Sequence, residues 1–287
     1  MTRPRSVVVT GASRGLGLAS AAELYSRGWH VLAAMRSVDD GMARLRERTG
    51  ATADDPRLSP ITLDLLDTGS IAGAVKAIRE TCGVPDALVH NAGIAAVACV
   101  EEMPADATEE VFTTNFFGPV QLTKELLPDM RAARTGRIVV VSSMGGLRGM
   151  PATSAYSAAK AALERWAESL AFEIAPFGLG VTVLVTGTYA TDIIGVSVRQ
   201  YSDKSGPYAG LYAPLDRMEP KVHRLARDPA QFARHLAAAL EDDRPFARRT
   251  SGLDATMMSA LHRLIPARAF AALVRGATRI PRAGSMR

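Results

Sequence analysis

The 287-residue sequence contains few cysteines and no pattern of residues that would bind a metal. Its two cysteines, Cys82 and Cys99, are too few for the disulfide network that stabilises small secreted proteins. No CxxC pair or cluster of cysteine and histidine has the spacing of zinc ligands. The composition therefore favours a reducing compartment and an organic cofactor rather than a metal.

Long hydrophobic runs are also absent. The longest uncharged run, residues 174–191, contains Pro176 and several glycines and threonines, so it cannot form a continuous apolar helix. At the N-terminus Arg3 and Arg5 precede a very short apolar run, and a glycine-rich turn follows at once, unlike a signal peptide. We expect a cytoplasmic protein.

The positive charge of the chain is confined to one end. The net charge is +5, but residues 245–287 contain eight arginines and one acid, Asp254, so residues 1–244 sum to −2. Because the body has no basic surplus, we expect no binding to nucleic acid. A hydrophobic fraction of 47% and a charged fraction of 22% are ordinary for a globular chain.

Strand-like and helical stretches alternate along the chain. The predicted strands are residues 6–10, 29–35, 59–63, 86–90, 137–142, 180–185 and 246–250. The predicted helices are residues 16–27, 42–48, 71–81, 108–134, 154–177 and 228–241. This alternation predicts an α/β fold with a single Rossmann-type doubly wound parallel sheet and helices on both faces. Ligands of such sheets bind beyond the carboxyl ends of the strands.

The first strand leads into three glycines, Gly11, Gly15 and Gly17, and then into a helix. Glycines let the backbone approach a pyrophosphate, and the helix N-terminus offers free N–H groups to it. By itself the pattern also fits a plain tight turn. Its spacing, however, resembles the TGxxxGxG motif of the short-chain dehydrogenase/reductase family.

Further residues match that family in order and spacing, namely Asn91-Ala92-Gly93, Asn115, Ser143, Tyr156 and Lys160. The resemblance covers roughly residues 5–255 and is closest to NADP(H)-preferring carbonyl reductases and hydroxysteroid dehydrogenases. It implies hydride transfer between a nicotinamide and a carbonyl or secondary alcohol. We expect a catalytic domain over residues 1–255, with an insertion at 188–225, and a basic extension over 256–287.

The predicted reacting centre combines a strand end with a helix face. Tyr156 and Lys160 are four residues apart on a predicted helix, so they share a face, and Ser143 ends a strand. The pair alone could be a surface pair, but its convergence with the glycine loop on one sheet edge favours catalysis. The resemblance implies that Tyr156 donates the proton, Lys160 also holds the nicotinamide ribose, Ser143 binds the substrate oxygen and Asn115 holds a water. We expect Lys160 and the oxidised cofactor to lower the pKa of Tyr156. A nucleophilic Ser143 is disfavoured because no GxSxG elbow surrounds it.

The choice of nicotinamide depends on two arginines. NAD-specific proteins place an acid at the end of the second strand, but here Met35 is followed by Arg36. Arg14, just before Gly15, matches a second arginine of NADP-preferring members. Guanidinium groups suit a 2′-phosphate, which predicts NADP(H); the alternative is two solvated surface charges.

The remaining cofactor contacts follow from the resemblance. The cofactor-binding set is Gly11, Ser13, Arg14, Gly15, Leu16, Gly17, Arg36, Asp64, Leu65, Asn91, Ala92, Gly93, Tyr156, Lys160, Gly187 and Thr191. Asp64 would meet the adenine and Asn91 the ribose, although each also suits a helix-preceding or turn position. Thr186 replaces the proline that usually precedes Gly187, which puts the geometry of that turn in doubt.

The insertion at 188–225 is irregular, apolar and aromatic. It contains Tyr189, Tyr201, Tyr208, Tyr212, Ile193, Ile194, Val196, Leu211 and Met218, and Met144, Leu147 and Met150 follow Ser143. These residues predict a lid over a bulky hydrophobic carbonyl or alcohol, such as a steroid, a long-chain ketone or a polyketide. They could equally cover the core or form a dimer contact.

The C-terminal tail predicts two amphipathic helices split by Pro266. Their apolar residues are Leu261, Leu264, Ile265, Phe270, Leu273 and Val274, flanked by arginines. Packing against the body is favoured over contact with a membrane surface. By resemblance, helices 108–134 and 154–177 would associate the chain into a homodimer or homotetramer. A rival function on the same fold is a non-catalytic NADP(H)-sensing protein.

Overall fold

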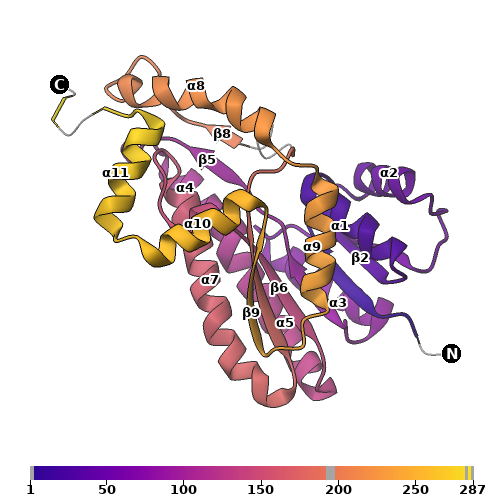
Figure 1. Cartoon of the computed structure of the whole chain (residues 1–287). Helices are drawn as coiled ribbons and strands as arrows, with labels where there is room; N and C mark the ends of the chain where they lie inside the picture. The colour runs from indigo at the N-terminus through magenta and orange to yellow at the C-terminus, as the bar shows by residue number, and fades with distance from the viewer. Residues whose placement is uncertain (1–2, 192–197, 282–283, 286–287) are drawn as a thin grey trace.

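The computed structural model describes residues 3–191, 198–281 and 284–285, and its centre is a parallel sheet of seven strands. Their bounds are β1 Ser6–Thr10, β2 His30–Met35, β3 Leu58–Thr62, β4 Ala87–His90, β6 Arg137–Ser143, β7 Gly180–Thr186 and β9 Phe246–Ser251. Across the sheet they lie in the order β3-β2-β1-β4-β6-β7-β9 (Figure 1). Because the chain winds outward in both directions from β1 and β4, the predicted doubly wound fold is confirmed.

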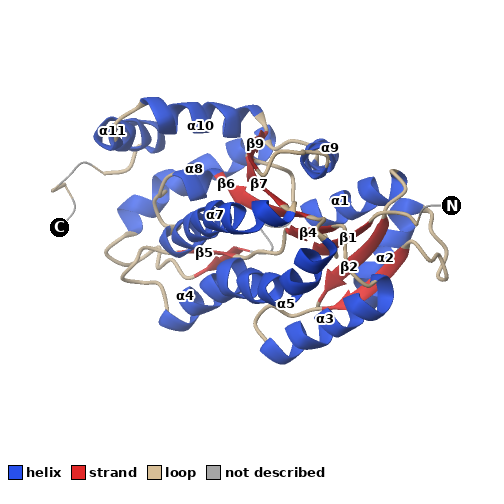
Figure 2. Ribbon diagram, turned by 90° about the horizontal axis from the view of Figure 1, so that it is seen from below, coloured by secondary structure: helices blue, strands red, loops and turns tan. Residues whose placement is uncertain are grey.

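Two helix layers cover the sheet (Figure 2). One layer consists of α1 Gly15–Ser26, α2 Val38–Thr49 and α9 Pro229–Leu240, and the other of α3 Thr68–Cys82, α5 Gly118–Ala133 and α7 Ser154–Ile174. The sequence of β1 shows why both faces are covered. Val7 and Val9 belong to one buried cluster and Val8 to the other, since successive side chains of a strand point to opposite faces.

The long helix predicted over residues 108–134 is interrupted. It consists of α4 Ala105–Phe112, a π-helical turn at Thr113–Phe117, and α5. Within the turn Asn115 is fully buried, and its amide nitrogen donates to the backbone oxygens of Ile94 and Val111, both at 2.8 Å. Such π-bulges are frequent at functional sites.

The prediction of an irregular insertion over 188–225 is wrong for much of its length. Helix α8 spans Ala209–Leu225 and includes Pro214 and Pro220. Strand β8, Val198–Gln200, pairs in parallel with β5, Ala95–Val97, so the insertion is attached to the segment after β4. The predicted lid residues Ile193, Ile194 and Val196 lie outside the described residues.

The tail forms α10, Leu253–Leu264, and α11, Ala267–Thr278, with the break at Pro266 that the sequence predicts. Phe270 and Thr278 of α11 are buried, so one face of this helix packs on the body. Within the described residues, none of the helices combines the length and apolar character needed to cross a bilayer.

Candidate active site

A cavity of about 380 Å³ lies along the carboxyl edge of the sheet. It brings together fifteen of the sixteen predicted cofactor-binding residues, which are Gly11, Ser13, Arg14, Gly15, Leu16, Gly17, Arg36, Asp64, Leu65, Asn91, Ala92, Gly93, Tyr156, Lys160 and Thr191. Gly187 does not line it. Sites of this volume bind small molecules and cofactors. The cavity therefore joins the glycine loop to Tyr156 and Lys160, whereas Ser143 and Asn115 are not among its lining residues.

The glycine loop depends on close backbone contacts. Gly11 has φ +69°, and a Cβ on Gly17 would lie 2.1 Å from the Gly11 oxygen and 2.5 Å from Nδ2 of Asn91. Asn91 secures the loop, because its Nδ2 donates to the Thr10 oxygen at 2.9 Å and its backbone N–H to Thr10 Oγ1 at 3.0 Å. No side chain caps the N-terminus of α1, so its N–H groups remain available to an anion. A pyrophosphate fits this loop.

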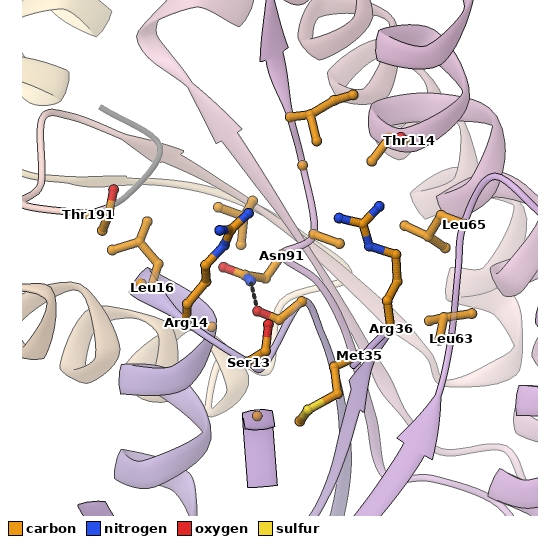
Figure 3. Close-up of a pocket in the computed structure, with 18 of the residues that line it drawn as sticks. Ser13, Arg14, Leu16, Met35, Arg36, Leu63, Leu65, Asn91, Thr114 and Thr191 are labelled. Atoms are coloured by element: carbon orange, nitrogen blue, oxygen red, sulfur yellow. Dashed lines mark hydrogen bonds between the residues drawn. The ribbon is translucent and has the colours of Figure 1, made fainter. Parts of the chain in front are cut away.

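Three arginines line the cavity near the end of β2. Figure 3 shows Arg14 and Arg36 on either side of Asn91. The sequence analysis missed the third, Arg44 of α2, whose Nη1 donates to the Ser13 oxygen at 3.4 Å. Asp40 lies in the first turn of α2, and Arg44 follows it by four residues, so both lie on one face of the helix. This spacing was the signal in the sequence that could have placed Arg44 at the site. Asp40 and Asp64 also line this end of the cavity, so three arginines face two acids there, and the positive excess suits a phosphate.

Some acidic residues at the edge of the sheet stabilise helix ends, and others line the cavity. Asp67 caps α3 by accepting from the Gly69 N–H at 2.8 Å. Asp64 accepts from the Leu66 N–H at 3.0 Å and also lines the cavity. Asp39 and Asp40 lie in the first turn of α2.

The predicted reacting groups meet between β6 and α7. Lys160 Nζ lies 5.9 Å from the centre of the Tyr156 ring and donates to the Val141 oxygen at 3.0 Å. Ser143 ends β6, its hydroxyl accepts from the Gly145 N–H at 3.2 Å, and the side chain is close enough to Tyr156 to lower the pKa of the phenol. The tyrosine and the serine are thus placed to hold one substrate oxygen together.

Asn115 and Lys160 meet at Gly93. A Cβ on Gly93 would lie 2.6 Å from Oδ1 of Asn115 and 3.4 Å from Nζ of Lys160. The amide oxygen accepts from the Ile94 N–H at 3.3 Å. Only a glycine at position 93 lets the loop after β4 approach both the Asn115 amide and the Lys160 ammonium group. The π turn that carries Asn115 therefore lies beside the lysine.

Burial controls the protonation of the centre. Desolvation raises the pKa of Tyr156, and the hydrogen bond with Ser143 opposes this only in part. This differs from the expected lowering by Lys160, because burial outweighs every opposing effect. The pKa of Lys160 is lowered to about 8 by burial, against the attraction of Glu164.

A buried ionic network supports α7 behind Lys160. Glu164 accepts from Ser142 Oγ at 2.6 Å and from Arg248 Nη1 at 2.5 Å, and Arg248 also donates to Glu168 at 2.8 Å. The network ties α7 to β6 and β9, so it fixes the helix that carries the tyrosine and the lysine. Sequence reasoning missed it because Glu164 and Arg248 are 84 residues apart.

The turn after β7 accommodates threonine in place of proline. Thr186 Oγ1 donates to the Ser142 oxygen at 2.7 Å, and the Gly187 N–H donates to the Ser251 oxygen at 2.8 Å. A Cβ on Gly187 would lie 2.0 Å from the Asp254 carboxylate, so this glycine packs on α10. Thr191 remains beside Gly15 at the cavity.

Most described tyrosines of the predicted lid belong to the framework. Tyr189 is 2% exposed and its hydroxyl lies 2.6 Å from Ser251 Oγ. Tyr212 is 3% exposed, accepts from the Cys99 N–H at 2.7 Å and donates to Glu102, while Tyr208 donates to Glu101. Tyr201 differs, because it packs in the apolar cluster that includes Tyr156.

Comparison with known proteins gives a consistent assignment. A family described as short chain dehydrogenase matches residues 5–201. Retinol dehydrogenase 8 of Bos taurus is 32% identical over 275 residues, which cover 92% of this chain and 86% of that protein. A crystal structure of a short-chain dehydrogenase from Streptomyces avermitilis has a TM-score of 0.80 and 32% identity, covering 97% of this chain and 99% of that one. The structure of ElxO with NADP bound shares the fold, with a TM-score of 0.69 and 22% identity over 87% of this chain and 97% of its own.

The chain therefore belongs to the short-chain dehydrogenase family. As such it is an oxidoreductase that acts on CH–OH or C=O groups. In the described part of the chain, no cluster of three acidic, histidine or cysteine side chains is arranged to hold a metal ion.

Proposed function

We propose that the protein transfers hydride between NADP(H) and the carbonyl or secondary alcohol of a bulky hydrophobic substrate. The observation that carries this proposal is one cavity in which an arginine-flanked glycine loop leads to Tyr156 and Lys160. When bound, the nicotinamide supplies or accepts the hydride. The residues of the chain bind the nucleotide, orient the substrate oxygen and handle the proton.

The phosphates are bound by the loop and by the arginines. The N–H groups at the start of α1 would hold the pyrophosphate. Arg14 and Arg36, with Arg44 beside them, favour the extra 2′-phosphate of NADP(H) over NAD(H). The NADP named in the ElxO structure is consistent with this choice on a related fold.

Tyr156 would donate the proton during reduction. Its raised pKa keeps the phenol protonated at neutral pH, and the alkoxide that forms on reduction is basic enough to take the proton. Ser143 donates a hydrogen bond to the same oxygen as negative charge develops on it. Lys160, held by the Val141 oxygen, presents its ammonium group beside the tyrosine and would hold the ribose hydroxyls.

An apolar cluster next to Tyr156 supports a bulky hydrophobic substrate. Ile94, Met103, Phe112 and Tyr201 are partly buried against the same small cluster of alanines and Val111 as the tyrosine. The relative named retinol dehydrogenase acts, by its name, on a large apolar alcohol, and a wall of this composition suits molecules of that class.

The test is to follow NADPH absorbance with purified protein against steroid ketones, long-chain ketones and aromatic polyketide-like ketones. Oxidation of NADPH that requires a bulky apolar ketone, and is slower with small polar ketones, supports the proposal. Tight NADPH binding without turnover of any ketone would instead favour a nucleotide-sensing protein.

We also propose that the chain forms a homodimer or homotetramer through the surfaces of α4–α5 and α7. Phe117 is 56% exposed and borders a hollow with Phe112 and Thr113. Phe172 of α7 is 83% exposed as well, and exposed apolar surface, where it is contiguous, marks association sites. Light scattering with Phe117→Ser tests this: a smaller species than the wild type supports the interface, and an unchanged mass contradicts it.

A further inference from the structure

The outer face of α10 carries a stripe of apolar side chains, formed by Leu253, Met257, Ala260 and Leu264. Leu253 is 66% exposed, Met257 57% and Leu264 80%. The spacing of four, three and four residues places them on one side of the helix. Ala255 and Ser259, on the other side, are buried against the body. The helix is therefore apolar on both of these faces, and the described chain covers only one.

The same helix pair is strongly basic. Arg263, Arg268, Arg275 and Arg279 are exposed, and none forms an ion pair with a carboxylate of the described residues. The one acid of the pair, Asp254, is already bonded to Arg227 at 2.6 Å and to the Thr188 N–H at 2.7 Å. The free charge of this surface is therefore positive.

Internal contacts hold the pair in place. Arg148, which ends the short helix α6 Met144–Leu147, donates through Nη2 to the oxygens of His262 and Ile265, both at 3.2 Å. Its guanidinium lies 5.2 Å from the centre of the Phe270 ring. Figure 2 shows α10 and α11 at the outside of the molecule, with α10 beside the edge strand β9. The stripe is thus a fixed part of the surface.

We propose that the outer face of α10 and α11 docks on an anionic lipid surface. Exposed leucines and a methionine would enter the boundary between headgroups and acyl chains, while the arginines contact lipid phosphates and carboxylates. The sequence favoured packing on the body instead. In the structure, α11 does pack on the body, through Phe270 and Thr278. This packing does not cover the apolar stripe of α10.

Charge argues for lipid over a second copy of the chain. A two-fold contact places the same patch of both copies face to face. The arginines of the two copies would then meet without acids to compensate them, which opposes association. An anionic membrane supplies both the apolar layer and the negative charge.

Co-sedimentation with vesicles tests the proposal. The full chain should bind vesicles of phosphatidylcholine mixed with phosphatidylserine, bind phosphatidylcholine alone more weakly, and dissociate as salt is raised. Arg263→Glu combined with Arg268→Glu should weaken binding by at least about 25-fold, because each basic side chain contributes roughly fivefold. Met257→Ser combined with Leu264→Ser should also weaken it.

Matched controls lie elsewhere on the surface. Arg48→Glu of α2 and Val100→Ser alter an exposed arginine and a 75% exposed valine, and they should leave vesicle binding unchanged. Binding that ignores the lipid charge, or that survives both double variants, would overturn the proposal. A dimer that Leu264→Ser converts to a monomer, without any vesicle binding, would assign the stripe to a second copy instead.

Docking and catalysis are measured separately. The four substituted residues line no part of the cavity, so NADPH binding in vesicle-free buffer should be unchanged in all variants. Loss of vesicle binding with intact NADPH binding therefore concerns the docking surface alone.

Discussion

Lys160 donates from Nζ to the backbone oxygen of Val141, 3.0 Å away, so the strand that ends in Ser143 also holds the buried ammonium group. This bond fixes the lysine beside Tyr156 in a place where its charge is poorly solvated. Burial accordingly lowers the pKa of Lys160 to about 8.

Ketone reduction should therefore lose rate above about pH 8, as the ammonium form disappears. Below that pH the lysine is charged, and above it each pH unit removes about tenfold of the active form. The measurement is kcat against pH. Lys160→Arg, which keeps its charge, should be slower but flat over the same range. A wild-type profile that is flat up to about pH 10 would contradict this role.

The arginines at the end of β2 should set the nucleotide preference. Arg36→Ala removes a charge-assisted hydrogen bond worth roughly 2 kcal/mol, so the KM for NADPH should rise about 30-fold while that for NADH changes little. Arg48→Ala, on the same helix α2 as Arg44 but outside the cavity, is the control. An equal effect of Arg36→Ala on both nucleotides would show that the arginine does not read the 2′-phosphate.

The glycine loop should tolerate no side chain at Gly17. In Gly17→Ala the new methyl group would meet the Gly11 oxygen at 2.1 Å, so the loop must shift and NADPH binding should be lost. Gly73→Ala in α3 meets no atom within 4 Å and should stabilise the protein by about 1 kcal/mol. Fluorescence titration and thermal melting measure the two effects. NADPH binding of wild-type strength in Gly17→Ala would refute the close packing.

His90 should make the fold sensitive to acid. It is fully buried, its Nε2 lies 2.7 Å from Thr123 Oγ1, and burial lowers its pKa to about 3. The unfolded chain binds a proton below about pH 6.5 and the folded chain does not, so stability is lost as pH falls from about 6.5 to 3. Over this range His90 lowers the free energy of unfolding by about 1.4 kcal/mol for each unit that the pH falls. When unfolding by denaturant is measured at several pH values, the free energy of unfolding of His90→Asn should depend less steeply on pH than that of the wild type. The same pH dependence in both proteins would place the proton uptake at another residue.

Local patterns in the sequence were sufficient to predict the sheet and the main catalytic helix. Inner strands of the central sheet such as β1, β4 and β7 are short runs buried on both faces, and Tyr156 and Lys160 share a helix face by spacing alone. The glycine loop could also be predicted, because its close backbone contacts, such as that of Gly17 with Gly11, admit only glycine. The requirement is therefore visible as a spacing of glycines in the sequence.

Features that depend on distant parts of the chain could not be predicted. The pairing of β5 with β8 joins segments about 100 residues apart, and the bond from Ser142 to Glu164 links a strand with a helix. Helix α8 was missed because Pro214 and Pro220 weaken its signal, while its stability comes from tertiary contacts such as Tyr212 with Cys99.

The most direct test of the central claim is kcat for NADPH oxidation by Tyr156→Phe, with a bulky ketone that the wild type reduces. We expect a loss of about 10²- to 10⁴-fold in kcat with unchanged NADPH affinity, because the phenol supplies the proton. Turnover close to wild type in Tyr156→Phe would show that another group is the acid.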